Sequence, residues 1–303
     1  MEYRAHGKFL LSGEYMVLKG ARALALPLKY GQSMQVSDIA FEGCRWHSSE
    51  KGHAWFEATL DSSMCVTATN MPAIGDRLEE ILASILRQRP EAVSLFRGKE
   101  FRFDTDFARD WGLGTSSTLL ALLAEYAKVD PYRLLADTFG GSGYDLACAI
   151  ASGPLFFTRR EGTPLVEPAP FDPPFKEHIF FVYLGNKQNS SAEVKKFFKE
   201  AVIREADIQR ISELAEAFCT AATPRELATL MKEHEQIMGR ILQTQPVQEK
   251  YFPDFAGAVK SMGAWGGDFV MVVSENEEKV TRKYFFDKGF VTILGYSNVL
   301  LRD

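Results

Sequence analysis

The sequence has little of what several large classes of protein need. Only four of its 303 residues are cysteines, Cys44, Cys65, Cys148 and Cys219, and no two of them form a Cys-x-x-Cys pair. This scattering argues against a structural zinc site and favours reduced thiols in a cytoplasmic protein. The five histidines show no His-Glu-x-x-His or similar ligand spacing, so we do not expect a transition-metal enzyme.

The chain also lacks an excess of positive charge and a long apolar run. Its 35 Lys and Arg residues against 40 Asp and Glu residues give a net charge of −5, which leaves no basic field to recruit nucleic acid or an anionic membrane. The longest apolar stretches, such as Leu119–Ala124 and Ile179–Leu184, are far shorter than the ~20 residues of a membrane-spanning helix. We therefore expect no nucleic-acid partner, no membrane span and a local site for any anionic ligand. No feature of the sequence indicates the oligomeric state.

What the sequence does contain is the composition of a globular protein. With 46% hydrophobic residues, the 303-residue chain can bury a large core, and at ~150 residues per domain its length favours two domains. Five prolines between Pro164 and Pro174 are typical of a linker. We therefore expect an N-terminal domain over residues 1–165 and a C-terminal domain over residues 175–303.

Hydrophobic periodicity predicts helices and strands in both halves. Three- and four-residue spacing predicts helices over residues 74–86, 119–126, 191–202, 208–221, 224–242 and 277–287. Short apolar runs predict strands over residues 101–103, 179–183, 269–273 and 291–294, and alternating runs with turn residues predict further strands near the amino terminus.

One turn carries candidate chemistry: Gly112-Leu113-Gly114-Thr115-Ser116-Ser117, between a predicted strand and a predicted helix. Glycines allow positive φ, so consecutive N–H groups at the start of a helix can approach a phosphate. The hydroxyl groups of Thr115, Ser116 and Ser117 can donate to phosphate oxygens or reach a bound Mg²⁺. No lysine follows the last glycine, so this is not a Walker A loop. On its own the motif is more often an ordinary turn with a Ser or Thr N-cap.

Three further segments, in a specific order, favour the functional interpretation. They are Gly7–Ala25, which opens with Gly-Lys and contains Gly-Glu, then Gly141-Ser142-Gly143-Tyr144-Asp145-Leu146-Ala147, and finally the Gly-rich Lys260–Asp268. With the turn at 112–117 they resemble the motifs of the GHMP kinases, which include galactokinase, homoserine kinase, mevalonate kinase and phosphomevalonate kinase. The resemblance covers most of the chain. It implies an α+β fold with a ribosomal-protein-S5-domain-2-like N-terminal domain and a ferredoxin-like C-terminal domain.

The resemblance also implies an ATP-dependent phosphotransferase. Residues 112–117 would bind the triphosphate of ATP, and Ser116 would help to hold Mg²⁺. Asp145 would orient or deprotonate the acceptor, and Lys8 would stabilise negative charge on the transferred phosphoryl group. From the residues alone, a helix N-cap is about as good an interpretation of Asp145, and Lys8 is an ordinary solvated strand lysine.

Within the family, the sequence resembles the bacterial phosphomevalonate kinases in particular. They resemble it in carrying Tyr after Gly-Glu, here Glu14 and Tyr15, and an aromatic residue before the second motif, here Trp111. The resemblance implies that Glu14 and Tyr15 contact the substrate. Trp265 departs from the pattern, since the family has a small residue there, and so bulky a side chain would narrow or reshape the pocket.

A last segment bears on the acceptor. Residues 185–191 resemble the loop that contacts the acceptor in these kinases, and Lys187 with Ser190 and Ser191 would suit an anionic small molecule. A capped helix with a surface lysine explains these residues equally well. The leading interpretation is a phosphomevalonate kinase of isoprenoid biosynthesis. Mevalonate kinase, another sugar or amino-alcohol kinase, and a catalytically silent ligand-binding relative remain alternatives. Asp137 and Glu125 are candidates for a further Mg²⁺ ligand.

Overall fold

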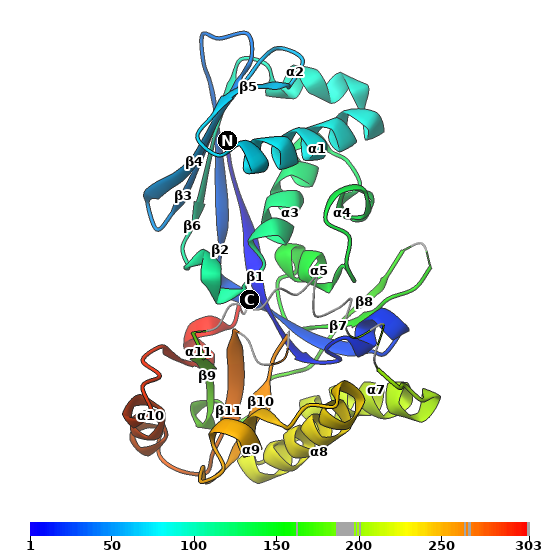
Figure 1. Ribbon diagram of the computed structural model, residues 1–303, viewed down its shortest axis with the longest axis vertical. Coiled ribbons are helices and arrows are strands. Elements are labelled where there is room, and N and C mark those ends of the chain that lie inside the picture. Colours follow the sequence, from blue (N-terminus) through cyan, green and yellow to red (C-terminus); the bar gives the residue numbers. More distant parts are fainter. Residues whose placement is uncertain are drawn as a thin grey trace. The chain divides into compact units, whose positions relative to one another are not determined.

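The computed structural model describes residues 1–161, 163–185, 197, 199, 201–263, 265 and 268–301. Within these ranges the chain folds as an α+β protein with two sheets (Figure 1). The first sheet contains β1 (Glu2–Ser12), β2 (Ala23–Asp38), β3 (Cys44–Glu50), β4 (His53–Leu60), β5 (Val66–Thr69), β6 (Lys99–Thr105), β7 (Leu155–Thr158) and β8 (Leu165–Pro168). The second contains β9 (Ile179–Tyr183), β10 (Ala258–Ser261), β11 (Phe269–Val273) and β12 (Ile293–Gly295). The expected α+β class is confirmed.

The two sheets differ in topology. The strand order of the first is β5-β4-β3-β6-β2-β7-β8, with β1 paired to β2. It is mixed, because β3 and β6 run parallel whereas β2 is antiparallel to β6 and β7. The second sheet is antiparallel, in the order β10-β11-β9-β12.

Contacts between residues divide the chain into two compact units. The first unit comprises residues 1–7, 30–109 and 113–150, and the second comprises residues 8–29, 110–112 and 151–303. The division is not a single cut, because residues 8–29 group with the later part of the chain. The expected domain ranges, 1–165 and 175–303, stay a prediction. The interpretation of the proline cluster as a linker was wrong in part, since residues 165–168 form the strand β8 at the edge of the first sheet, where proline is tolerated.

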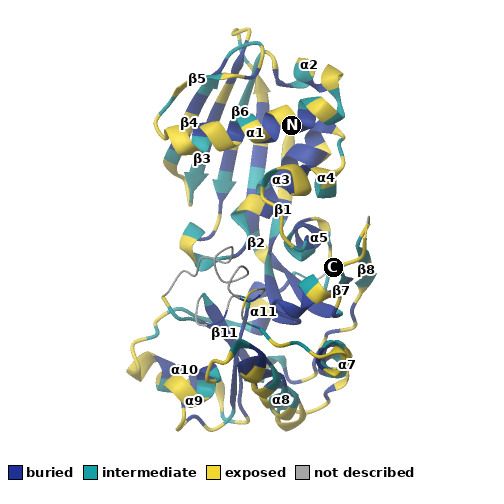
Figure 2. Ribbon diagram, turned by 45° about the vertical axis from the view of Figure 1, so that its right-hand side comes forward, coloured by how far each residue is buried: buried dark blue, intermediate teal, exposed yellow. Residues whose placement is uncertain are grey.

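In the first unit, helices cover one side of the strands (Figure 1). They are α1 (Pro72–Gln88), α2 (Val93–Phe96), α3 (Thr115–Ala127), α4 (Pro131–Thr138) and α5 (Tyr144–Ile150). The apolar positions of α1, spaced by three and four residues, are buried as an amphipathic helix requires. On the neighbouring strands β3 and β6, Trp46 stacks on Phe103 with ring centroids 4.4 Å apart. Buried residues therefore concentrate between helices and strands (Figure 2).

The second unit holds the antiparallel sheet and the remaining described helices. These are α7 (Glu205–Thr220), α8 (Pro224–Leu242), α9 (Val247–Tyr251), α10 (Glu278–Asp287) and α11 (Tyr296–Val299). Helix α8 packs against β10 and against α7. On β1, the ring of Phe9 contacts Phe181 of β9 and Phe269 of β11, at centroid distances of 4.6 and 5.2 Å. Because side chains alternate along a strand, Lys8 lies on the opposite face of β1.

The periodicity located most of the long elements. The structure has α8 at 224–242, β9 at 179–183 and β11 at 269–273, as predicted. Helix α3 begins four residues earlier than expected, at Thr115, and the predicted helix over 191–202 lies largely outside the described residues. Strand β10 was missed, because residues 260–268 were assigned as a whole to a Gly-rich loop. None of the helices in the described ranges is long and apolar enough to cross a membrane.

Candidate functional site

The predicted phosphate-binding turn lies at the start of α3. Gly114 precedes the helix with φ of 95°, in the left-handed region that glycine tolerates best, and its carbonyl accepts the first helical hydrogen bond from Thr118 N at 3.0 Å. The hydroxyl of Thr118 donates to Gln32 Oε1 of β2 at 2.8 Å, which anchors the helix start to the sheet. The N–H groups of a first turn have no carbonyl partner within the helix and can donate to a ligand.

The predicted nucleotide-binding residues differ in exposure. The side chain of Ser116 is exposed and that of Thr115 is half-buried. Leu113 and Ser117 are buried, at 1% and 8% exposure. A ligand at the start of α3 can therefore reach the hydroxyl groups of Thr115 and Ser116 directly, whereas the other two side chains support the turn from inside.

A pocket of about 230 Å³ opens beside this turn, entirely within the first unit. Apolar and aromatic side chains form most of its wall, with a few polar groups: Gln32, Trp46, Ser48, Trp55, Phe56, Ile74, Arg77, Leu78, Ile81, Thr105, Arg109, Thr115, Ser116, Leu119 and Phe139. The guanidinium carbon of Arg109 lies 3.5 Å from the ring centroid of Trp55, and Arg109 Nε donates to Glu50 Oε2 at 3.2 Å. An apolar slot that meets hydroxyl groups and a helix start is suited to a ligand with a flat ring and an anionic tail.

Gly112 shows why the predicted motif needs glycine at its first position. Its φ is 68°, and a Cβ atom on it would lie 1.9 Å from Oδ2 of Asp268. The second unit thus brings the first residue of the Gly-rich turn against the last residue of the third motif. Any side chain at position 112 would have to displace the Asp268 carboxylate.

The two predicted catalytic residues lie on different elements. Lys8 is half-buried on β1, in the second unit. Asp145 is half-buried in the first turn of α5, in the first unit, one residue after the helix begins. Asp145 therefore stands within the helix rather than at the position before it. Its role as a general base stays a prediction, as does the role of Lys8.

The predicted substrate residues Glu14 and Tyr15 follow β1 in a tight turn. Tyr15 has φ of 57°, its hydroxyl accepts the N–H of Trp265 at 3.1 Å, and its ring stacks on Phe197 with centroids 5.2 Å apart. Glu14 is fully buried and forms an ion pair with Lys260 of β10. Burial would raise the pKa of Glu14, but the charge of Lys260 outweighs this effect and holds the pKa below its usual value.

Of the remaining predicted site residues, three lie outside the described part of the chain and Asp137 makes another contact. Lys187, Ser190 and Ser191 lie outside the described residues. Asp137 is occupied elsewhere, because its carboxylate accepts the hydroxyl of Ser84 at 2.7 Å. Across the described ranges no three His, Cys, Asp or Glu side chains gather as metal ligands. Among the described residues, the Ser116 hydroxyl is the predicted metal ligand that the structure leaves exposed.

Comparison with known proteins identifies the fold. No protein-family model and no curated protein sequence matches the chain. A solved mevalonate kinase superposes with a TM-score of 0.72 over 100% of both chains at 13% identity. Phosphomevalonate kinase of Streptococcus pneumoniae, in complex with phosphomevalonate and AMPPNP, superposes with a TM-score of 0.70 over 97% of this chain and 99% of its own at 15% identity. Galactokinase of Lactococcus lactis, complexed with galactose, superposes with a TM-score of 0.67 over 99% of this chain and 94% of its own, at 11% identity.

The chain has the GHMP kinase fold. The family resemblance read from four short motifs is thereby confirmed at the level of fold. The similar structures are kinases with different acceptors, so the GHMP kinase fold by itself does not select a substrate for this chain.

Sequence reasoning missed a group of buried polar residues in this GHMP kinase fold. Besides Glu14 and Lys260 it includes His234 and Glu235 of α8, which are 0% and 3% exposed. A signal was available: positions 227, 231, 234, 235 and 238 share the buried face of α8, and two of these five residues are polar. Polar residues at helix positions that face the core require partners.

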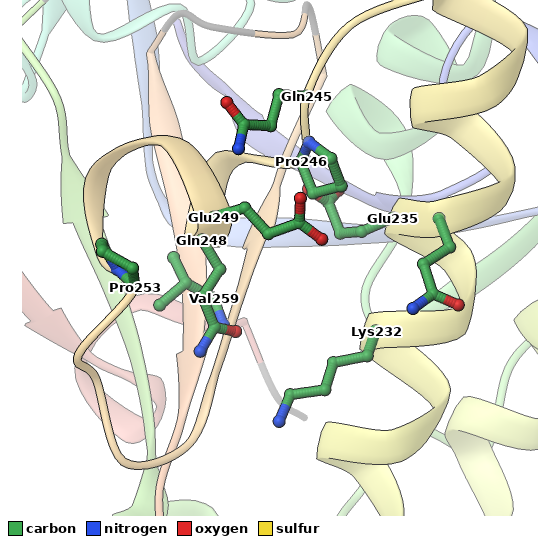
Figure 3. A pocket seen from close by; sticks show the side chains of 9 residues that line it. Lys232, Glu235, Gln245, Pro246, Gln248, Glu249, Pro253 and Val259 are labelled. Carbon is green, nitrogen blue, oxygen red and sulfur yellow. The ribbon is translucent and has the colours of Figure 1, made fainter.

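Glu235 also borders a second pocket, of about 480 Å³, in the second unit (Figure 3). Lys232 and Glu235 reach it from α8, Gln248 and Glu249 from α9, and Val259 from β10. Its wall contains none of the residues predicted for nucleotide or substrate. The buried cluster consists of four residues, Glu14, His234, Glu235 and Lys260. It borders this pocket at Glu235.

Proposed function

We propose that the chain is an ATP-dependent kinase of small molecules, with phosphomevalonate or a close relative as its acceptor. The observation that carries the proposal is the start of α3, where Gly114, Thr115 and Ser116 adjoin an aromatic pocket within a GHMP kinase fold. A fold shared with several kinases supports phosphoryl transfer in general, and the Streptococcus pneumoniae structure supports this acceptor.

The nucleotide would occupy the first unit. Its base would enter the pocket between Trp55 and the residues of α1, and its phosphates would reach the first turn of α3. There the helix start contributes roughly half a positive charge, and the N–H groups and hydroxyls of Thr115 and Ser116 would donate to phosphate oxygens. Gly114 leaves room for this approach because it has no side chain.

The donor set fits a magnesium ion bound together with the nucleotide. Mg²⁺ takes oxygen ligands and is commonly held by one or two protein groups plus substrate phosphates, and the exposed Ser116 hydroxyl is such a group. When bound, the ion would neutralise charge on the phosphates. Asp137 is a poor further ligand because Ser84 already donates to its carboxylate.

The phosphoryl group would pass from ATP to an oxygen of the acceptor, with ADP leaving. Asp145 would orient that oxygen, and for an alcohol acceptor it would also accept the proton. A phosphate acceptor such as phosphomevalonate attacks with an ionised oxygen and needs only orientation. The Lys8 ammonium would balance the charge that develops on the transferred group. Tyr15, together with Lys187, Ser190 and Ser191, would hold the anionic acceptor.

Mevalonate is the second candidate acceptor, favoured by the likeness to a mevalonate kinase at a TM-score of 0.72. The two differ in charge at the reacting oxygen, so Asp145 would have to act as a base for mevalonate but not for phosphomevalonate.

A coupled ADP-release assay with Mg-ATP tests both candidates. Phosphomevalonate, mevalonate, homoserine and hexoses would be offered separately, and we expect turnover with phosphomevalonate. Calorimetry with AMPPNP forms the second arm, in which Gly114→Val should abolish binding while circular dichroism stays unchanged. Binding of AMPPNP without turnover on any acceptor would indicate a silent relative. Failure of the wild-type chain to bind AMPPNP would refute the nucleotide site.

A further inference from the structure

The buried cluster joins three segments of the second unit. Lys260 Nζ, besides its ion pair with Glu14, donates to Ser261 O at 2.7 Å. Nε2 of His234 lies 3.2 Å from Oε2 of Glu14 and accepts the N–H of Gly13 at 3.3 Å. Charged and neutral groups of α8, β10 and the turn after β1 therefore meet in one buried place.

Glu235 extends the cluster to the backbone. Its Oε1 accepts the N–H of Ser261 at 3.1 Å, and its Oε2 accepts the N–H of Val247 at 3.3 Å and the Ser261 hydroxyl at 3.4 Å. One side chain thus holds the end of β10 and the start of α9. Figure 3 shows Glu235 projecting from α8 toward the segment that carries Pro246.

The cluster is electrically balanced. Burial, followed by the charge of Lys260, lowers the pKa of His234, so the imidazole is neutral at pH 7. Burial raises the pKa of Glu235 to about 8, although Lys260 and the two backbone N–H groups act in the opposite direction. Glu235 is therefore mostly protonated at pH 7, and the charges of Glu14 and Lys260 cancel.

Such an arrangement is a poor way to gain stability alone. A buried ion pair loses so much hydration that apolar side chains of the same size often serve a fold equally well or better. What it provides is fixed geometry, because Lys260 and Glu235 both form hydrogen bonds with backbone groups. Here the geometry that is fixed belongs to Gly13–Tyr15, which lies in the first motif, and to Lys260 and Ser261, which open the third.

The two motifs also meet through a second contact. The hydroxyl of Tyr15 accepts the N–H of Trp265, four residues beyond Ser261. A larger residue does not fit at Gly13 without a shift of Ala23, since the φ of Gly13 is 87° and a Cβ atom on it would lie 2.7 Å from Ala23 Cβ. The cluster and this hydrogen bond therefore hold the first-motif turn and the third-motif segment at two points.

We propose that Lys260, His234 and Glu235 are positioning residues of the acceptor site, which lock the turn Gly13–Tyr15 to the segment that begins at Ser261. They touch no substrate themselves. The expected change in acceptor KM rests on the proposed function. The expected change in backbone hydrogen exchange does not.

Glu235→Leu is the principal test. It removes the three hydrogen bonds that the Glu235 carboxyl group accepts from Ser261 and Val247, and it leaves Glu14 and Tyr15 unchanged. Hydrogen exchange read by mass spectrometry should show at least tenfold faster exchange in peptides that contain Gly13 and Ser261, and no change in a peptide from α10. In the kinase assay we expect the acceptor KM to rise about 10- to 100-fold, as expected when positioning is lost, with an unchanged ATP KM. Glu235→Gln keeps a carbonyl acceptor and should restore most of both readouts.

Glu233→Leu is the matched control on the same helix, since the Glu233 carboxylate makes a partly exposed ion pair with Arg210. If Glu235→Leu does not fold, Glu14→Gln combined with Lys260→Met replaces the ion pair by neutral side chains of similar size, and exchange at Gly13 and Ser261 is measured there. A lower melting temperature with wild-type exchange and wild-type KM would overturn the proposal. If the wild-type chain has no kinase activity, the proposed function fails, and exchange alone decides whether the cluster locks the turn.

Discussion

The start of α3 in the first unit and the buried cluster in the second use polar groups in opposite ways. At α3 an exposed Ser116 and a half-buried Thr115 border an open pocket. Around Glu14 the charged groups are enclosed, and most of their polar atoms contact one another or nearby backbone. We propose that the first region accepts a ligand and that the second holds backbone segments in place.

This difference has a thermodynamic basis. N–H groups and hydroxyls at a helix start are hydrated in the free protein and lose little when a phosphate replaces the water. A buried charged group has no water to replace a lost partner. Removing one member of a buried ion pair therefore leaves the charge of the other member uncompensated. Substitutions in the first region should therefore change activity at nearly constant stability, and substitutions in the second should change stability as well.

Asp145→Asn should separate the effect on activity from the effect on stability most clearly. Turnover should fall by a factor on the order of 10²–10⁴ for an alcohol acceptor, the usual worth of a positioned base, with nucleotide affinity nearly unchanged. Because Asp145 is only half-buried in the first turn of α5, the free energy of unfolding should change by no more than about 1 kcal/mol. Steady-state kinetics and urea unfolding provide the two numbers. Wild-type turnover of the variant with an alcohol acceptor would refute the role of Asp145 as a general base.

Lys260→Met should behave in the opposite way. It leaves the Glu14 carboxylate buried without its cation, and we expect a loss of about 3–5 kcal/mol in the free energy of unfolding. Arg210→Met is the control, because Arg210 pairs with Glu233 at the surface, where both side chains are more than a third exposed and such a pair is worth at most about 1 kcal/mol. Equal losses of unfolding free energy in the two variants would show that the buried ion pair contributes no more to stability than a surface ion pair does.

The contrast between the regions also decides what could be predicted from sequence. The Gly-rich turn is contiguous, and its glycines, hydroxyls and position before an apolar helix can be read from six residues. Long elements such as α8 and the strands β9 and β11 follow from periodicity alone. The cluster joins Glu14 to Lys260 across 246 positions, so no local pattern reports it.

Local reasoning failed for β10 in particular. Its four residues include a lysine, and an isolated lysine predicts an exposed position, yet Lys260 is 0% exposed. The pocket beside α3 was missed for a related reason, because its aromatic wall is assembled from β3, β4 and residue 139. Packing between distant segments decides both features.

A smaller effect is expected for Lys187→Ala, which tests the acceptor proposal. If the acceptor carries a phosphate, the variant should lose a charge-assisted contact of ~1.5–3 kcal/mol, roughly a 10- to 150-fold rise in acceptor KM, while the ATP KM stays constant. Kinetics with each substrate varied in turn would measure it. An equal loss with a neutral acceptor, or an effect on ATP alone, would remove the phosphomevalonate interpretation and leave a kinase of unassigned acceptor.

The pH dependence of stability gives the finest test of the buried region. The pKa of Glu235 rises from 4.5 to about 8 on folding, so between these values the unfolded state has lost a proton that the folded state keeps. The protonated carboxyl group therefore stabilises the fold fully below pH 4.5, and this contribution declines as pH rises toward 8, by about 1.4 kcal/mol per pH unit. From pH 6.5 to 8, where most other carboxyl groups are already ionised, the loss should be roughly 2 kcal/mol.

Glu235→Gln isolates this contribution, because the amide does not titrate. The variant should gain roughly 2 kcal/mol relative to the wild-type chain between pH 6.5 and 8 in urea unfolding at a series of pH values. Glu233→Gln, two positions away and partly exposed, should follow the wild-type curve. Parallel curves for the wild-type chain and Glu235→Gln would mean that Glu235 is already ionised at pH 6.5. The cluster would then carry a net negative charge. Its charges would not be balanced, and the description of the cluster as a neutral group that holds backbone would be wrong.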